Sequence, residues 1–353
     1  FKQKTAYEIK ECDWSSDVCS SDLGISIGLL LAFCVAANAQ TQDWNAVIAA
    51  AKREGSVSFY AAYPNAALQS ATVKSFQDKY GIRVDLLQIR ASELHERIRT
   101  EQAAGRFLGD VLQASDASTE LRYSTGHVGK LGFLPNSKNM LPGMDAGEFR
   151  VGAFIAPFGV MVNTNLVKPG EEPKSWRDLA DPKWKGKILL DDPRALGSGH
   201  AYFAALYRLF GDELHKKIAA NQPMLSRDVG ASERRAGRGE FPVWIPAATS
   251  GMGGLQGLPV KYIAPTEGVP NSPMDHSILT NAPHPNAARL FVDHFISVEF
   301  QTEVARLGLL PVLKDMEPRM PAEMQPFARV PLLKSADAES QEMMLKLATE
   351  IYK

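Results

Sequence analysis

Helical and extended patterns alternate along the chain from Trp44 onwards, and this alternation restricts the possible folds more than any other feature of the sequence. The expected segments of the first region are a helix over 44–54, a strand over 56–60, a helix over 66–80, a strand over 82–89, a helix over 92–104 and a strand over 109–113. Gly55 and Gly81 are expected to end the first two helices, and Ser92 to cap the third. This order predicts βαβ units and a mainly parallel sheet.

An apolar run over 153–163 separates this region from a second one with similar alternation. The run is interrupted by Pro157 and Gly159, and it suits a strand that passes from one lobe to another. Further expected segments are strands over 187–190, 241–245 and 260–264, and helices over 199–210, 211–221, 286–297, 300–306 and 340–352. We expect the strand over 260–264 to lead back across.

Two α/β regions with two crossings predict two lobes, each a mainly parallel sheet flanked by helices. The expected boundaries place residues 41–152 and 269–353, with the C-terminal helices, in lobe 1, and residues 153–268 in lobe 2. Ligands bind in the cleft between lobes of this kind.

All three cysteines precede residue 40, at Cys12, Cys19 and Cys34. The rest of the chain therefore offers no disulfide, zinc–thiolate site or cysteine nucleophile. The formal net charge is −1, which gives no indication of the basic face that nucleic-acid-binding proteins carry.

Residues 24–39 form a short apolar run that ends in Ala37-Asn38-Ala39. Small side chains at 37 and 39 fit a signal peptidase, so we expect a secretory signal that is cleaved after Ala39. A buried helix, a membrane anchor and lipid attachment at Cys34 are the alternatives. Residues 1–23 resemble a translated sequencing adapter, and we interpret them as a non-native leader.

Catalytic motifs are missing from the sequence. Gly197-Ser198-Gly199 lacks the spacing of a nucleophile elbow, and there is no Walker A loop or dinucleotide-binding turn. The seven histidines are scattered and include no His-Glu-x-x-His pair. We therefore predict a protein without enzymatic activity, cofactor or metal. An exported hydrolase is the alternative, and a transferase similar to porphobilinogen deaminase would need a cysteine-bound cofactor.

Four stretches, in order, resemble one known family. They are residues 44–55, residues 174–187 with Lys174-Ser-Trp-Arg-Asp-Leu179, Glu267-Gly268, and residues 284–297. They are similar to the extracellular solute-binding proteins of the ferric-iron, thiamine and polyamine importer group, which have a type II periplasmic-binding fold. We expect Trp176 and Trp184 to pack inside a lobe and Pro285 to begin a helix.

The resemblance implies a periplasmic receptor that closes two lobes around a small ligand and docks on an inner-membrane ABC permease. We expect a monomer, with hinges near 157–163 and 264–268. A partnership with a chemoreceptor would use the same closed form.

Ligands in this fold contact loops at the carboxyl ends of strands and the N-termini of helices. The candidate ligand-binding residues of lobe 1 are Tyr60, Tyr63, Arg90, Ser92, Ser115 and Asp116. Those of the crossings and lobe 2 are Phe158, Asn163, Ser198, Gly199, His200, Thr249 and Glu267. Core packing, a surface charge or a plain helix cap is the alternative for several of them. Arg90 offers bidentate pairing with a carboxylate or phosphate, and Leu196-Gly-Ser-Gly-His200 offers an anion cradle before a helix.

Iron-binding members of the family carry two adjacent tyrosines in the loop where this chain has Ala247, Ala248 and Thr249. The resemblance therefore implies that free ferric iron is not the ligand. The remaining Ser, Thr and Arg side chains favour a small organic anion, such as a carboxylate, phosphonate or sugar phosphate. A polyamine or thiamine-like cation is the alternative, for which Glu267 is the available carboxylate.

Overall fold

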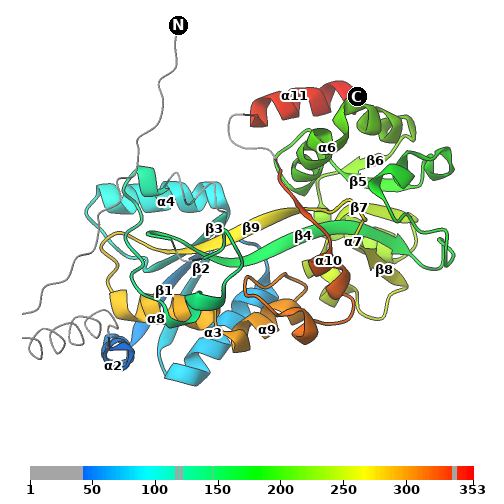
Figure 1. Cartoon of the computed structure of the whole chain (residues 1–353). Helices are drawn as coiled ribbons and strands as arrows, with labels where there is room; N and C mark the ends of the chain where they lie inside the picture. The colour runs from blue at the N-terminus through cyan, green and yellow to red at the C-terminus, as the bar shows by residue number, and fades with distance from the viewer. Residues whose placement is uncertain (1–42, 116–118, 120–121, 146, 336–339) are drawn as a thin grey trace, which may run out of the picture. The chain divides into compact units, whose positions relative to one another are not determined.

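The computed structural model describes residues 43–115, 119, 122–145, 147–335 and 340–353 (Figure 1). The expected leader, signal segment and cysteines, and also Asp116, lie outside the described residues. None of the described helices is both long enough and apolar enough to cross a lipid bilayer.

The strands are β1 (Ser56–Ala61), β2 (Arg83–Gln88), β3 (Val111–Ser115), β4 (Val151–Asn163), β5 (Ile188–Asp191), β6 (Met224–Ser226), β7 (Val243–Ala248), β8 (Val260–Ile263), β9 (Val269–Ile278) and β10 (Leu332–Leu333). The α-helices are α2 (Trp44–Glu54), α3 (Ala66–Tyr80), α4 (Ala91–Ala103), α6 (Ser198–Ala220), α7 (Val229–Gly237), α8 (Pro285–Phe295), α9 (Val298–Arg306), α10 (Gln325–Arg329) and α11 (Gln341–Ile351). Short 3₁₀ turns include η1 (Pro135–Asn139), η2 (Trp176–Ala180), η3 (Pro182–Trp184), η4 (Thr249–Leu255) and η5 (Glu317–Arg319).

The strands form one continuous sheet in the order β2-β1-β3-β9-β4-β7-β5-β6, with β10 on β9 and β8 on β4. β1 is parallel to β2 and β3, and β5 is parallel to β6 and β7. Long antiparallel strands β4 and β9 join these two groups and run side by side in Figure 1. The expected α/β class is confirmed. Below, lobe 1 means β1–β3 with their helices, and lobe 2 means β5–β8 with α6 and α7.

β4 passes from one group of strands to the other, as the apolar run predicted. Its first half, Val151–Pro157, pairs with β9, and its second half, Phe158–Asn163, pairs with β7 and β8. Every residue of β4 is buried, which explains why the run is continuously apolar instead of alternating.

The return crossing is β9, not the strand predicted over 260–264. That segment forms β8, which pairs with Val160–Asn163 and stays in lobe 2. The sequence of β9 contains two prolines and several polar residues, so it does not look like a buried strand. Some of its buried polar groups are paired inside the protein: Asp275 accepts from Arg150 at 2.8 Å, and His276 lies 3.1 Å from Gln113, whereas the Ser277 hydroxyl has no partner among the described residues.

Local signals explain most helix ends. The Asn65 side chain accepts from the backbone N–H of Leu68 and caps α3, which ends at Gly81 with φ of 69°. Ser92 is not the cap of α4, because the helix begins one residue earlier and Arg90 occupies the cap position. Gly211, with φ of 68°, breaks α6 into the two helices that were predicted.

Large buried side chains fill both lobes. Trp176 and Trp184 are buried as predicted, and Trp176 donates its indole N–H to the Gly268 carbonyl at 2.8 Å. Pro285 begins α8 as predicted, and α8 packs on α2 and β1 of lobe 1.

The last helix does not join lobe 1 as expected. α11 packs on α6 of lobe 2, where the two helices lie together in Figure 1. Met344, Ala348 and Tyr352 enter the same apolar core as Trp176, and the Tyr352 hydroxyl lies 3.1 Å from His215 Nδ1. α6 also packs on β9, β7 and η2, and α11 covers a further part of its apolar surface.

Candidate ligand-binding site

The carboxyl ends of the parallel strands bring the loops of each lobe to one edge. In lobe 1, Tyr63 follows β1 and Arg90 follows β2, and Gln88 at the end of β2 donates to the Tyr63 carbonyl at 3.2 Å. In lobe 2, Arg227 follows β6 and Ser250 follows β7. The Tyr63 hydroxyl lies 3.1 Å from the Ser250 hydroxyl, so the two edges face each other. Ligands of open α/β sheets bind outside such edges.

Tyr63 is held in place by a buried network. Gln69 donates to the Tyr63 carbonyl at 3.2 Å and to the Gln113 side-chain oxygen at 2.9 Å. Gln113 in turn lies 3.1 Å from His276, and the Tyr63 ring packs edge-on against Phe154. Burial raises the pKa of the Tyr63 phenol, which therefore stays protonated and can donate a hydrogen bond.

The expected anion cradle at the start of α6 already holds a carboxylate of the chain itself. Asp191, the last residue of β5, accepts from the Ser198 hydroxyl at 2.5 Å and from the Gly199 N–H at 2.6 Å. A side chain at Gly199 would clash with the Asp191 carbonyl, since a Cβ would lie 2.3 Å from it. Burial raises the pKa of Asp191. The sequence showed the donors of the cradle but not the acceptor that fills it.

A second carboxylate, Asp192, is shared by two guanidinium groups. Arg194 Nε donates to it at 2.8 Å and Arg227 Nε at 3.2 Å. The hydrogen bond from Arg194 holds the pKa of Asp192 below its usual value. The Arg227 side chain is 68% exposed, so it can also contact a ligand. Arg194 further donates to the Tyr352 carbonyl at 3.1 Å, which ties the C-terminal segment to this edge.

The loop after β7 is fastened to lobe 1. The hydroxyl of Thr249, which is fully buried, donates to the Gly308 carbonyl at 2.6 Å. Gly308 has φ of 76°, and a Cβ there would lie 2.3 Å from the Thr249 carbonyl, so only glycine permits this approach. Thr249 was predicted to contact the ligand, but its hydroxyl group donates its hydrogen bond to this contact between the lobes.

Glu233 of α7 is a further candidate residue, which the sequence did not indicate. Its carboxylate lies against Gly251, where a Cβ would be 2.6 Å from Oε2. Burial raises the pKa of Glu233 to about 7. Neither α7 nor β6, and hence neither Glu233 nor Arg227, was recognisable from the pattern of apolar residues.

Three predicted candidates are occupied in packing or structural hydrogen bonds. Tyr60 is buried and donates to Glu101 at 3.0 Å. Asn163 is buried and donates to the carbonyls of Ala236 and Gly237 at 3.0 Å. Glu267 accepts from the Ser175 hydroxyl and the Trp176 N–H.

The other candidates fall into two groups. Phe158 and His200 are buried, and burial lowers the pKa of His200, which favours its neutral form. Arg90 and Ser92 are exposed at the start of α4, and Ser115 lies at the carboxyl end of β3. The structure thus brings Tyr63, Arg90, Ser92 and Ser115 to the edge of lobe 1.

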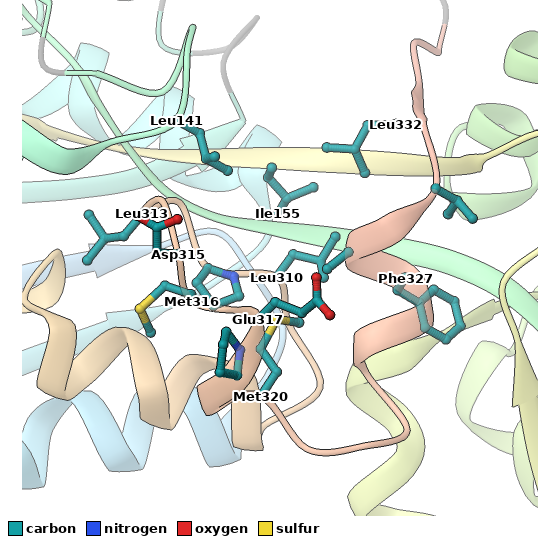
Figure 2. Close-up of a pocket in the computed structure, with 14 residues that line it drawn as sticks. Leu141, Ile155, Leu310, Leu313, Asp315, Met316, Glu317, Met320, Phe327 and Leu332 are labelled. Carbon is teal, nitrogen blue, oxygen red and sulfur yellow. The ribbon is translucent and has the colours of Figure 1, made fainter.

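An apolar cavity of about 450 Å³ lies away from these residues (Figure 2). It is lined by Ile155 of β4, Leu310 and side chains of the following segment, including Met316, Met320 and Phe327. None of the candidate ligand-binding residues lines it. A polar solute needs hydrogen-bond partners that this cavity offers only at its margin, so the strand ends are the better candidate site.

In this fold two long strands join two groups of parallel strands, and the edges of these groups face each other. This arrangement defines a type II periplasmic-binding fold. Residues 138–339 match the family described as bacterial extracellular solute-binding protein, and the chain belongs to this family. Its members are solute-binding receptors of ABC importers and not enzymes.

Solved structures agree on the fold. Iron-bound HitA from Pseudomonas aeruginosa is 22% identical, with a TM-score of 0.67 over 84% of this chain and 99% of its own. AfuA from Actinobacillus pleuropneumoniae with exogenous fructose-6-phosphate is 22% identical, with a TM-score of 0.61 over 84% of this chain and 96% of its own.

Two curated proteins are similar to this chain in sequence. An uncharacterized protein of Haemophilus influenzae is 26% identical over 72% of this chain and 77% of its own length. Iron uptake protein A1 of a Synechocystis strain is 32% identical over 33% of this chain and 32% of its own length.

Proposed function

We propose that this receptor binds a small organic anion between the facing edges of the two lobes, in the periplasm after removal of a signal peptide, and delivers it to an ABC permease. The observation that supports an anionic ligand is a pair of exposed guanidinium groups, which belong to Arg90 at the end of β2 and Arg227 after β6. Arg90 has no ion-pair partner among the described residues. Guanidinium groups suit carboxylates and phosphates because they donate two parallel hydrogen bonds.

Charges nearby favour an anion over a cation. Both oxygens of Asp192 already accept from Arg194 or Arg227, and Asp191 accepts from Ser198 and Gly199. A cation would have to compete for these two carboxylates. A third, Glu233, accepts nothing from the described residues, but burial raises its pKa to about 7 and so favours its neutral form below that pH. The N-termini of α6 and α7 add partial positive charge at the same edge.

Among the related structures, HitA is iron-bound and AfuA carries fructose-6-phosphate. In this chain β7 ends in Ala247 and Ala248 and is followed by Thr249, so this position has no phenolate side chains. We therefore propose that free ferric iron is not the ligand. Titration with ferric citrate should produce no visible phenolate charge-transfer band, and the appearance of such a band would contradict this proposal.

Closure of the two lobes is the proposed mechanism. The hinge lies where β4 changes partner, from Asn271 opposite Pro157 to Ala248 opposite Phe158, and near residues 264–268, before β9. A ligand that contacts both edges would favour the closed form. Small-angle scattering should show a decrease in radius of gyration when a tight ligand is added.

A thermal-shift screen of the protein against organic acids, phosphonates, sugar phosphates and polyamines tests the class of ligand. An anion at about 100 times its dissociation constant should stabilise the fold by roughly 2.7 kcal/mol. Arg90→Ala and Arg227→Ala should weaken binding of the hit at least tenfold. Arg106→Ala is the matched control, because Arg106 is exposed just before β3, at the opposite edge. Stabilisation by polyamines alone, unaffected by either arginine, would refute the proposal.

A further inference from the structure

Beneath the contact between the lobes lies a carboxylate whose hydrogen-bonding capacity the chain does not use. Both oxygens of Glu233 lie against the backbone of Gly251, because a Cβ at Gly251 would be 2.6 and 2.8 Å from them. Among the described residues, no hydrogen bond or ion pair reaches either oxygen. Gly251 directly follows Ser250, which contacts Tyr63 of lobe 1.

The side chain of Tyr262 lies in the same region, and its hydroxyl group is also unused by the described residues. The Tyr262 hydroxyl is buried and has no hydrogen-bond partner in the described part of the chain. The Tyr262 ring packs against the apolar cores of both lobes, so it sits at their junction. Tyr262 packs in the same apolar cluster as Ala236 of α7, the helix that carries Glu233, and both α7 and β8 contact the η4 turn that contains Gly251. Burial, and secondarily the charge of Glu233, raises the pKa of Tyr262.

Such groups are costly to bury without partners. Most buried polar side chains in proteins are hydrogen-bonded, and an unsatisfied one destabilises the fold. Here the half-buried Glu233 carboxylate is an acceptor that the described residues leave unused, and the buried Tyr262 hydroxyl is a donor and acceptor without a partner among them, at the place where the two lobes meet. A ligand that carries hydroxyl groups can donate to the first and accept from the second.

We propose that Glu233 and Tyr262 form a subsite for the hydroxyl groups of the ligand, so that this receptor selects hydroxylated organic anions over anions without hydroxyl groups. The inference rests on the proposed function, in which the anionic group binds at the arginine residues. Gly251 has a defined part in the subsite, since any side chain at this position would displace the Glu233 carboxylate.

Matched pairs of anions test the subsite by isothermal titration calorimetry. The pairs are malate and succinate, citrate and propane-1,2,3-tricarboxylate, and glycerol 3-phosphate and propyl phosphate. Within each pair the charged groups match and one or two hydroxyl groups differ. For at least one pair, the wild-type protein should bind the hydroxylated member ten or more times more tightly.

Variants then assign the preference to these two residues. Glu233→Met, similar in size but without hydrogen-bonding oxygens, and Tyr262→Phe should each reduce the preference to less than threefold. Both should leave the affinity for the member without hydroxyl groups within a factor of two. Glu233→Gln keeps one acceptor oxygen and should retain part of the preference. Glu323→Gln, a change at an exposed position before α10, should have no effect.

Each outcome decides between the two proposals. Equal binding of both members by the wild-type protein would overturn the subsite and leave the anion receptor standing. An equal loss for both members in Glu233→Met would overturn direct contact with hydroxyl groups, because it would indicate a structural role. If no anion of the panel binds but spermidine does, the proposed function fails, and the subsite fails with it.

Discussion

Replacing Glu233 by Gln should make the stability of this protein less dependent on pH, without any ligand present. Burial raises the pKa of Glu233 from an ordinary value of 4.5 to about 7. The folded protein therefore holds a proton on Glu233 between these two pH values, whereas the unfolded chain releases it. In this window the unfolded state binds fewer protons, so the stability of the wild-type protein falls as the pH rises.

The magnitude follows from the difference in proton affinity. Each tenfold difference is worth about 1.4 kcal/mol, so the charge on Glu233 destabilises the folded state by roughly 3 kcal/mol above pH 7. The full stabilisation by the neutral form is present below pH 4.5 and is lost as the pH rises through 7. Gln carries no charge at any pH, so the Glu233→Gln variant escapes this loss.

Equilibrium urea denaturation of both proteins at pH 4.5 and pH 8 measures the effect. The free energy of unfolding of Glu233→Gln minus that of the wild type should increase by about 3 kcal/mol between the two pH values. Any constant effect of the substitution cancels in this comparison. Glu323→Gln, at an exposed position, should show a constant difference. A difference for Glu233→Gln that changes by less than about 0.5 kcal/mol would refute the burial argument.

Two further substitutions test how the chain is held together. Met344→Ala should destabilise the protein by about 2–5 kcal/mol, because Met344 is buried in the lobe 2 core, whereas Met343→Ala should be nearly neutral, because Met343 is 51% exposed. Equal effects in urea denaturation would mean that α11 does not pack on α6. Gly159→Ala should lower the melting temperature markedly, since a Cβ would lie 2.4 Å from the Ile263 carbonyl and 2.7 Å from Phe327. A melting temperature within a degree of the wild type would show that this part of β4 tolerates a side chain.

Local chemistry made several features of lobe 1 predictable. The helix over 44–54 and the helix over 66–80 agree with α2 and α3, because an amphipathic face and a terminal glycine are local signals. The apolar run over 153–163 indicated a strand that passes from one lobe to the other, and β4 does so. Tyr63 and Arg90 could be named as candidates because they lie in the loops that follow predicted strands.

Several features of lobe 2 could not be predicted from local sequence signals. α7 was not predicted, because its nine residues include three glycines or serines and two arginines and lack a strong apolar stripe. Glu233 looks like any charged residue of a surface helix, and its burial depends on Gly251, 18 positions later in the chain. Likewise, the donors at the start of α6 suggested an anion site, but the Asp191 carboxylate occupies it.

The sequence alone therefore determined the class of fold, the first crossing strand and the resemblance to a solute-binding family, since these depend on periodicity and on contiguous motifs. Only the tertiary structure decided that β9 is the return crossing, that α11 joins lobe 2, and that Tyr63 meets Ser250. The physical reason is the separation in sequence of the residues that interact. Helix caps and periodic apolar faces depend on neighbours a few residues apart. The burial of a carboxylate, or the partner of a hydroxyl, is set by residues that only the completed fold brings together.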